Sequence, residues 1–411
     1  MPFASSAYGQ LAYIAETTTN VVPTVGNATK LRMTTPTMKA ATSTVKSAEV
    51  SSHGMSTDQT ITDLNIDGGF NFELSGKEYD PFIEGVMMGT WSHYGTLGLG
   101  TAFSATTTAS TITAAVAPTT TSAFTNLGLN QWFKVVPPVG ASQAVKDYFA
   151  DRWFKTHAST PSSTTVVTLD ASTPIAAPGL GALGAGYAIS ASVVQNGVTQ
   201  RSFSMEYQMT DIGQFLTFSG MRPGTLELSL DTGSIITGSM GFLGGSDHTM
   251  QGTTRMPGSL QASQTLDVMN AVTDVGAIYE NGSSILSASA GFIKSAKFNM
   301  SRNLRGQKAV GVFGNAGVGL GECEVGGSLE IYVENATYYN KWLKGTQTSL
   351  ALGMADQYGN GYLIEMEKVK FGDAGLNAGG LGDDTMLTLP FNAFYNGTTG
   401  RGIRIVRAIA A

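Results

Sequence analysis

The stretch GGFNFELSGKEYDPFIEGVM, residues Gly68–Met87, predicts a β-strand followed by a short helix. Its first half alternates apolar with polar residues, which is the period of a strand with one buried face. Its second half places apolar residues at helical spacing, and a proline stands in the first turn, where its missing N–H costs nothing. The alternating apolar positions are Phe70, Phe72 and Leu74, and the helical ones include Phe82 and Ile83.

A similar unit appears a second time at Gly326–Gly345, GGSLEIYVENATYYNKWLKG. Again an alternating stretch (Leu329, Ile331, Val333) precedes apolar residues at helical spacing that include Trp342 and Leu343. Upstream, VKSAEV at Val45–Val50 matches IKSAKF at Ile293–Phe298. Because these elements recur in one order, we predict two copies of one β fold in tandem.

Composition supports a strand-rich structural protein. The chain has 411 residues, enough for two or three domains, because single cores rarely grow beyond about 250 residues. Charged residues make up 13%, about half the usual share, and Gly contributes 51 residues. Such a poorly charged surface favours a protein that buries much of its surface against other subunits, although a β protein with few charges can also be monomeric.

Charge and cysteine content exclude several classes of protein. The net charge of −6 argues against a nucleic-acid clamp, which needs concentrated cationic charge, but an acidic surface would keep passing DNA from sticking. Cys323 is the single cysteine, so no internal disulfide can form. We see neither a secretory signal nor a run of about 18 apolar residues, and we expect no membrane segment.

The predicted fold is mainly β, with two β-sandwich/barrel domains, each flanked by a short helix, and an inserted small β domain. Changes in sequence texture set the expected boundaries. These are an N-terminal arm at 1–27, a first domain at 28–100 and 198–245, an inserted domain at 101–197, a linker at 246–268 and a second domain at 269–411. The inserted domain should carry one helix, at Ala141–Trp153, where apolar residues share one face.

No motif indicates an enzyme. The four histidines, at 53, 93, 157 and 248, each lack a neighbouring ligand at metal-binding spacing. Cys323 lies between two glutamates, which would raise its pKa and reduce its reactivity. We therefore expect no catalytic residue, no cofactor and no metal.

Three segments resemble the tail tube proteins of long, non-contractile-tailed bacteriophages, the siphophage major tail proteins. They are the opening MPFASSAYGQLAYIAETTTNVVPT, the stretch STDQTITDLNIDGGFNFELSGKEYDPFIEGVMMGTW and the run VTQRSFSMEYQMTDIGQFLTFSGMRPGTLELSLDTGSIITGSMGFLG. The second half of the chain is similar more loosely.

The resemblance implies a structural virion protein that self-assembles into stacked rings and forms the conduit for genome delivery. Inner sheets of neighbouring subunits would lie side by side and line a DNA channel. Implied partners are further copies of the chain, the tape measure, tail tip and terminator proteins, and phage DNA in transit without sequence-specific binding. The protein would be synthesised in the host cytoplasm and reside in the virion tail.

A chain that carries the tube unit twice would need three copies for a pseudo-sixfold ring, so a homotrimer is expected. The resemblance also implies residue roles. One strand face and the helices would form the core (Phe70, Phe72, Leu74, Phe82, Ile83, Leu329, Ile331, Val333, Trp342, Leu343). The opposite face would look into the channel (Asn71, Glu73, Ser75, Glu330), where carboxylates would repel phosphates.

Segments without a packing pattern are candidates for contacts between stacked rings: the N-terminal arm, Thr34–Asp63 and Arg302–Gly321. The main alternative is a β-rich adhesin or carbohydrate-binding structural protein on a virion or cell surface. That class would explain the Ser/Thr-rich insertion, but it predicts clustered aromatic residues, and the four tryptophans are scattered along the chain.

Overall fold

The computed structural model of the protein consists mainly of antiparallel strands, with only three short α-helices in the part that it describes. It describes residues 3–50, 52–93, 102–108, 110–114, 124, 127–138, 140–150, 152–163, 165–175, 182–275, 277–285 and 292–409. Parts of the predicted inserted domain, including 115–123 and 176–181, therefore lie outside the described residues.

The strands on either side of the insertion form what we call the first unit. Its elements are a 3₁₀ turn (Ser6–Tyr8), β1 (Gly9–Ala15), β2 (Thr29–Leu31), β3 (Thr35–Pro36), β4 (Lys39–Lys46), β5 (Gln59–Glu73), α1 (Asp80–Met87), β14 (Phe203–Met209), β15 (Gln214–Asp231), β16 (Thr237–Leu243) and β17 (His248–Gln251).

The remaining strands form the second unit. Its elements are β18 (Ala277–Glu280), β19 (Ser283–Ser284), β20 (Ile293–Ser301), β21 (Arg305–Gln307), β22 (Gly317–Gly319), β23 (Glu324–Tyr332), α3 (Thr337–Leu343), β24 (Thr348–Ala355), β25 (Gly361–Phe371), β26 (Gly375–Asn377), β27 (Met386–Ala393) and β28 (Ile403–Ala408).

The inserted segment forms a separate six-stranded sheet with its own apolar cluster around Phe133, Phe149 and Ile189. The helix expected at Ala141–Trp153 occupies Gln143–Ala150. The last strand of this region, β13, leaves the small sheet and pairs with β28 of the second unit. The elements are β6 (Ser92–His93), β7 (Ala102–Thr108), β8 (Thr111–Ala114), β9 (Trp132–Val136), α2 (Gln143–Ala150), β10 (Phe154–Lys155), β11 (Val166–Thr168), β12 (Ala182–Ser190) and β13 (Ser192–Gln195).

The two units share one pairing scheme. In the first unit the antiparallel neighbours are β2–β1–β14–β15–β16–β5–β4. In the second unit the antiparallel neighbours are β19–β18–β24–β25–β27–β23–β20, in the same chain order. Each of these seven strands of one unit therefore has a counterpart in the other.

Irregularities in the strands recur as well. The ladder of β14 with β15 shifts register between Phe203 and Met205, and that of β24 with β25 shifts between Thr348 and Leu350. A bulge is a local device that re-aims a strand, so its appearance at matching places supports two copies of one architecture.

Pairing also gives the residue correspondence, and it corrects the match of Val45–Val50 with Ile293–Phe298. Phe70 and Leu329 are buried counterparts, and they lie opposite Pro36 and Ala296 respectively. Nine residues further along each strand, Val45 pairs with Thr60 and Arg305 pairs with Gly319. Val45 thus corresponds to Arg305 and not to Ile293. The shared tripeptide Lys-Ser-Ala is a coincidence of sequence, because so short a match does not determine which residues of the two strands are equivalent.

The units join edge to edge through β15 and β20, whose ladder runs from Thr225 opposite Ser301 to Asp231 opposite Ser295. The result is one continuous sheet with the order β3/β4–β5–β16–β15–β20–β23–β27–β26. Over the described residues this sheet does not close on itself, so the β-barrel that we predicted is not a property of the single chain.

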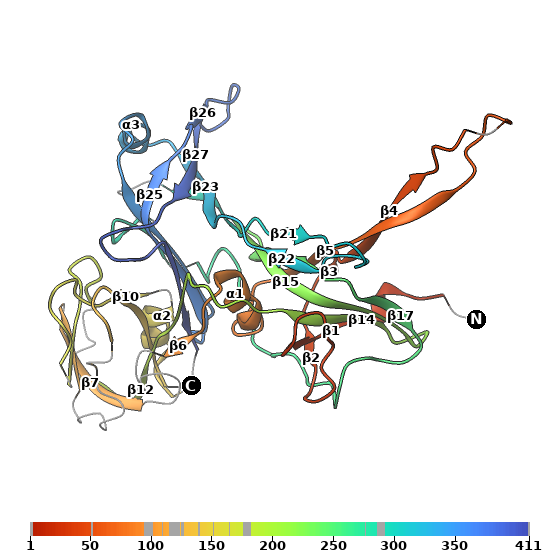
Figure 1. Ribbon diagram of the computed structural model, residues 1–411. Coiled ribbons are helices and arrows are strands. Elements are labelled where there is room, and N and C mark those ends of the chain that lie inside the picture. The colour runs from red at the N-terminus through yellow and green to blue at the C-terminus, as the bar shows by residue number, and fades with distance from the viewer. Residues whose placement is uncertain are drawn as a thin grey trace.

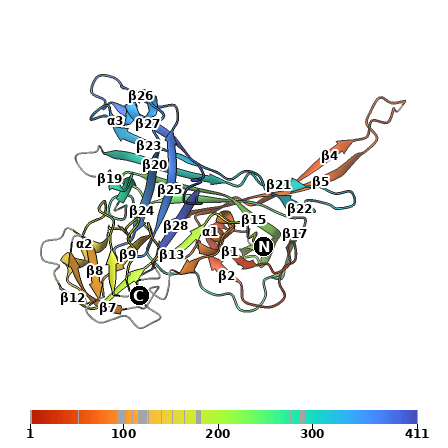
Figure 2. The same ribbon diagram turned by 60° about the vertical axis from the view of Figure 1, so that its left-hand side comes forward.

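One long hairpin projects from the sheet. Strands β4 and β5 run together well beyond the body of the molecule, and β4 is almost entirely exposed (Figures 1 and 2). The counterpart hairpin of β21 and β22 is much shorter. Helix α1 lies under the middle of the large sheet, whereas α3 lies at its outer end near β26 (Figure 1).

Candidate functional site

The large sheet has one apolar and one polar face, because its six central strands alternate in phase with one another. On the apolar face, Phe70, Met240, Leu226, Met300 and Leu389 all belong to one buried cluster. Every intervening position then faces the other way. The polar residues of all six strands therefore lie on one face of the sheet, and this polar surface is the candidate functional site.

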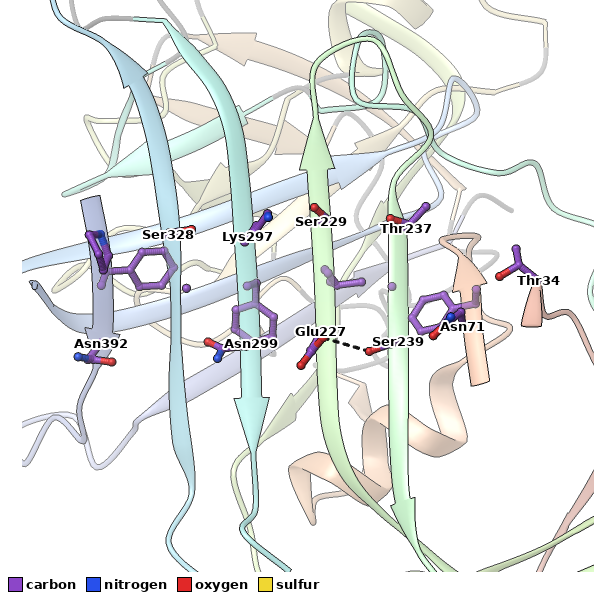
Figure 3. A pocket seen from close by; sticks show the side chains of 17 residues that line it. Thr34, Asn71, Glu227, Ser229, Thr237, Ser239, Lys297, Asn299, Ser328 and Asn392 are labelled. Atoms are coloured by element: carbon purple, nitrogen blue, oxygen red, sulfur yellow. Dashed lines mark hydrogen bonds between the residues drawn. The ribbon is translucent and has the colours of Figure 1, made fainter. Parts of the chain in front are cut away.

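Cross-strand register arranges this polar surface in rows. One row crosses all six strands as Asn71–Ser239–Glu227–Asn299–Gly326–Asn392. The next row is Glu73–Thr237–Ser229–Lys297–Ser328–Pro390. Figure 3 shows the side chains of both rows that line the hollow, among them Asn71, Glu227 and Lys297, with Ser239 donating a hydrogen bond to Glu227 at 3.3 Å.

The rows line an open hollow of about 740 Å³, and residues of both units contribute to it. Thr34 extends the lining on the first-unit side, and Asn392 marks the far side (Figure 3). The hollow therefore spans the β15–β20 seam, so it depends on both units.

Acidic residues outnumber basic ones on this surface. The cations on the six strands are Arg222, Lys294 and Lys297, and Arg222 is directed to Thr19. Lys294 is 3.5 Å from Glu330, which also accepts a hydrogen bond from Ser295. The remaining positions are mostly Ser, Thr, Asn and Gly. Such a surface presents negative charge and short side chains to a polyanion, which favours repulsion over capture. The acidic positions are Glu73, Glu227, Asp231, Glu324 and Glu330.

The four residues expected to face a channel differ in position. Asn71 is exposed and lines the hollow, while Glu73 and Glu330 are half-buried on the same face. Ser75 is a correction: it is 0% exposed and forms an isolated bridge with Val268. Strand β5 ends at Glu73, so the alternation that assigned Ser75 to the polar face has already stopped.

Most of the expected core residues lie in the buried cluster beneath the sheet, and Trp342 packs against its edge. Val333 and Leu343 are corrections, since they are 41% and 64% exposed. Val333 follows the last residue of β23, and Leu343 is the last residue of the peripheral helix α3. The buried residues are Phe70, Phe72, Leu74, Phe82, Ile83, Leu329 and Ile331.

Sequence reasoning missed the contributions of four strands, β15, β16, β20 and β27, to the polar surface. The alternation of Leu226, Leu228 and Leu230 was visible, but it does not reveal which strands become neighbours. Glu227 and Lys297 are 70 positions apart and reach adjacent strands only through the β15–β20 ladder.

A buried ionic cluster lies away from this surface, where the insertion meets the second unit. The carboxylate of Glu365 accepts hydrogen bonds from Trp132 at 2.8 Å and from Nε of Arg404 at 2.6 Å, and Nζ of Lys155 is 3.3 Å away. Burial acts to raise the pKa of Glu365, but Arg404 and Lys155 outweigh it and hold that pKa below the usual carboxyl value.

A second buried pair connects α1 to the second unit. Asp80 accepts a hydrogen bond from the Tyr362 hydroxyl at 2.7 Å and forms an ion pair with Arg407. The Arg407 guanidinium also stacks on Trp91, 4.8 Å from the ring centre. Burial raises the pKa of Asp80, although Arg407 and Tyr362 favour the charged form. Both clusters are internal ties between segments.

The described part of the chain has neither a cluster of metal ligands nor a helix that could span a membrane. No group of three or more His, Cys, Asp or Glu side chains is arranged to hold a metal ion. No helix there has the length and apolar character needed to cross a bilayer.

Comparison with known proteins places the chain in a family. A family model described as "Phage tail tube protein" matches residues 7–393. No curated protein matches the chain.

Proposed function

The chain belongs to the phage tail tube protein family, and from that premise we propose that it assembles into stacked rings that form the tube of a long, non-contractile tail and conduct the genome to the host. The polar surface would line the channel of that tube. The two units, 28–100 with 198–245 and 269–411, are proposed as two tube domains of one chain, with 101–197 inserted in the first.

One observation carries this proposal: the acidic, short-chained polar surface runs without a break across both units. A conduit needs a wall that holds no phosphate, because each cationic contact with DNA would add to its affinity. The polar face of the sheet would form the channel wall, while its apolar face packs on the buried core.

Strand spacing supports three copies per ring. Each chain contributes eight neighbouring strands, β3/β4, β5, β16, β15, β20, β23, β27 and β26. At about 4.8 Å per strand, roughly 24 strands give a circumference of about 115 Å and a diameter of about 37 Å, more when strands tilt. That leaves room for a duplex about 20 Å across after side chains are counted, whereas two copies would be too narrow.

Projections from the rings would serve assembly along the tube. The N-terminal arm predicted at 1–27 is a correction, because its strand β1 pairs with β14 and Leu11 belongs to the buried core. The β4–β5 hairpin extends far from the sheet, and the β21–β22 hairpin also lies outside the core. We propose these segments as contacts between rings. Tape measure, tail tip and terminator proteins would be further partners in the virion.

Electron microscopy of the concentrated, purified protein tests the proposal. We expect stacked rings with threefold symmetry and a central hole of about 20 Å or more. Sixfold rings would retain the tube function but contradict two tube domains per chain. A compact monomer at every concentration, with or without a tail-tip initiator, would favour the adhesin alternative.

Reversing charge on the wall should make the tube retain DNA. We expect tubes of Glu227→Lys/Asn299→Lys to bind duplex DNA at about 50 mM salt and release it near 200 mM, since six phosphate contacts lose about 10³ in affinity over that range. Co-sedimentation of labelled DNA with tubes measures this.

The matched control is Asp147→Lys/Gln143→Lys, which makes the same charge changes on the exposed helix α2 of the insertion. Control and unmodified tubes should leave DNA in the supernatant. Equal retention by both variants would show that the polar surface is not the face that DNA meets.

A further inference from the structure

We propose that the seam between neighbouring copies repeats the seam already present inside each chain. Residues 373–377 of one copy pair antiparallel with residues 37–41 of the next, so that Leu376 lies opposite Met38. This inference rests on the proposed ring, and it names the two edges that close the ring and their register.

The internal seam serves as the template. Its ladder places Leu228 opposite Phe298, both buried on the apolar face of the sheet. The N–H of Thr232 donates to the carbonyl of Lys294, and the N–H of Arg302 donates to that of Gly224. These bonds fix which residues exchange hydrogen bonds, because such pairs alternate along an antiparallel ladder. Leu228 and Phe298 form such a pair, whereas Glu227 and Asn299 do not.

Strand β26 is the counterpart of the seam half of β15. Glu227 lies opposite Ser239 on β16, and Gly375 lies opposite Thr388 on β27. One residue further, Leu376 corresponds to Leu228. Each unit has one extra residue just before this segment, at Gly224 in β15 and between Phe371 and Gly375 in the second unit. The residue correspondence between the two units therefore stays the same on both sides of the bulge.

Strands β3 and β4 are the counterpart of β20. Pro36 lies opposite Phe70 as Ala296 lies opposite Leu329. Met38 therefore corresponds to Phe298 and packs against the same apolar cluster from its edge. On both edges the side chains alternate as they do at the internal seam, so Leu376 and Met38 lie on the apolar face of the sheet.

Each edge lacks a neighbour within the chain. Among the described residues, β26 pairs only with β27, and β3 and β4 pair only with β5. The two edges lie at opposite ends of the sheet (Figures 1 and 2). Leu376 is 57% exposed, whereas its counterpart Leu228 is 6% exposed. An open edge with an exposed apolar side chain is a template for a further strand.

A second copy of this chain is the occupant that fits. The two edges are different surfaces of one molecule, and a contact of this head-to-tail kind closes into a ring when the rotation permits. The internal seam demonstrates that a β15-type edge and a β20-type edge are complementary in register and in burial.

Engineered cysteines test the register. The variant Lys39→Cys/Gly375→Cys is made in a Cys323→Ser background. The equivalent residues at the internal seam are Asn299 and Glu227, which lie opposite each other without exchanging hydrogen bonds. The Cα atoms of such a pair are about 4.5 Å apart, which suits a disulfide. A Cβ at Gly375 meets no atom within 4 Å, so the cysteine fits. Oxidised tubes should give covalent dimers and trimers on a non-reducing gel, and the ladder should end at three chains.

The matched control is Lys39→Cys/Leu376→Cys, whose side chains would point to opposite faces of the sheet, and it should give no ladder. Glu227→Cys/Asn299→Cys should link within one chain and calibrates the oxidation. If the Lys39→Cys/Gly375→Cys protein forms tubes without cross-links, or the control links equally well, the proposed seam is wrong while the tube function stands.

A second variant covers a failure of the cysteine protein to assemble. Leu376→Asp should raise the critical concentration for assembly about tenfold or more, because it places a charge in the seam, whereas Leu381→Asp, on a fully exposed loop residue, should leave it unchanged. Equal assembly by both proteins would overturn the seam. Absence of assembly by the unmodified protein under all conditions would instead overturn the ring itself.

Discussion

Replacing Arg404 by methionine is expected to lower the free energy of unfolding of the single chain by about 3–5 kcal/mol. The change leaves the Glu365 carboxylate buried without its main cationic partner. It also removes the bonds that Arg404 donates to Gln131 and to the carbonyl of Asn130, so the insertion loses part of its attachment. Urea denaturation followed by circular dichroism measures the loss.

Two further variants identify the cause. Arg404→Met/Glu365→Gln should recover part of the lost stability, because it removes the buried carboxylate that has lost its main partner and keeps an acceptor for Trp132. Lys155 loses its carboxylate partner in this variant and keeps its contact with the Trp132 ring, so the recovery is incomplete. Arg401→Met, which breaks a partly exposed pair 3.6 Å from Glu367, should cost no more than about 1 kcal/mol. An Arg404→Met protein within 1 kcal/mol of the unmodified protein would contradict the argument.

The same cluster gives a pH dependence. Because the pKa of Glu365 is held below its value in the unfolded chain, the folded state binds fewer protons through this group. Its stabilisation is fully present above the unfolded-state pKa of about 4.3 and is lost as the pH falls through the lower, folded-state pKa. Acid titrations should show a smaller loss for Arg404→Met/Glu365→Gln than for the unmodified protein. Identical acid profiles would argue against this role.

Phe82→Ala is expected to cost about 3–5 kcal/mol, the usual range for a fully buried phenylalanine. The ring of Phe82 is 0% exposed and lies 4.7 to 5.5 Å, centre to centre, from the rings of Tyr13, Phe203, Phe70 and Phe242. The deletion therefore opens a cavity where α1 meets strands β1, β5, β14 and β16. Thermal and urea unfolding should both show the loss.

Leu343→Ala on helix α3 is the matched control. Its side chain is largely exposed in the single chain, so the cost should stay within about 0.5 kcal/mol. Comparable losses for the two variants would mean that α3 is as tightly packed as α1, which would contradict the difference between the two helices.

The alternation of apolar and polar residues predicted which residues share a face of the sheet, but it did not predict where each strand ends. It grouped Phe70 with Phe72 and Leu329 with Ile331, which share the buried cluster. It failed at Ser75 and Val333, since a strand ends where its ladder ends and not where the pattern fades. It also could not place Glu227 beside Asn299, because that neighbourhood depends on a pairing between distant segments.

The attachment of the insertion was equally hidden. Lys155 lies more than two hundred positions from Glu365, and Asp80 more than three hundred from Arg407, whereas Arg404 is 39 positions from Glu365. Charged residues are usually found on the surface, and nothing local marks these as buried. The sequence therefore predicted a separate small β domain but not the ionic contacts that hold it.

The unequal hairpins of the two units have a consequence for how a tube is built. In a ring of three copies, long β4–β5 hairpins would alternate with short β21–β22 hairpins around the rim. A rim of six identical projections would let the next ring seat at every 60° of rotation, while alternating projections leave only settings 120° apart. The unequal lengths would thus reduce the number of rotational settings for each added ring from six to three. Fewer settings would keep the rotation from one ring to the next constant along the tail.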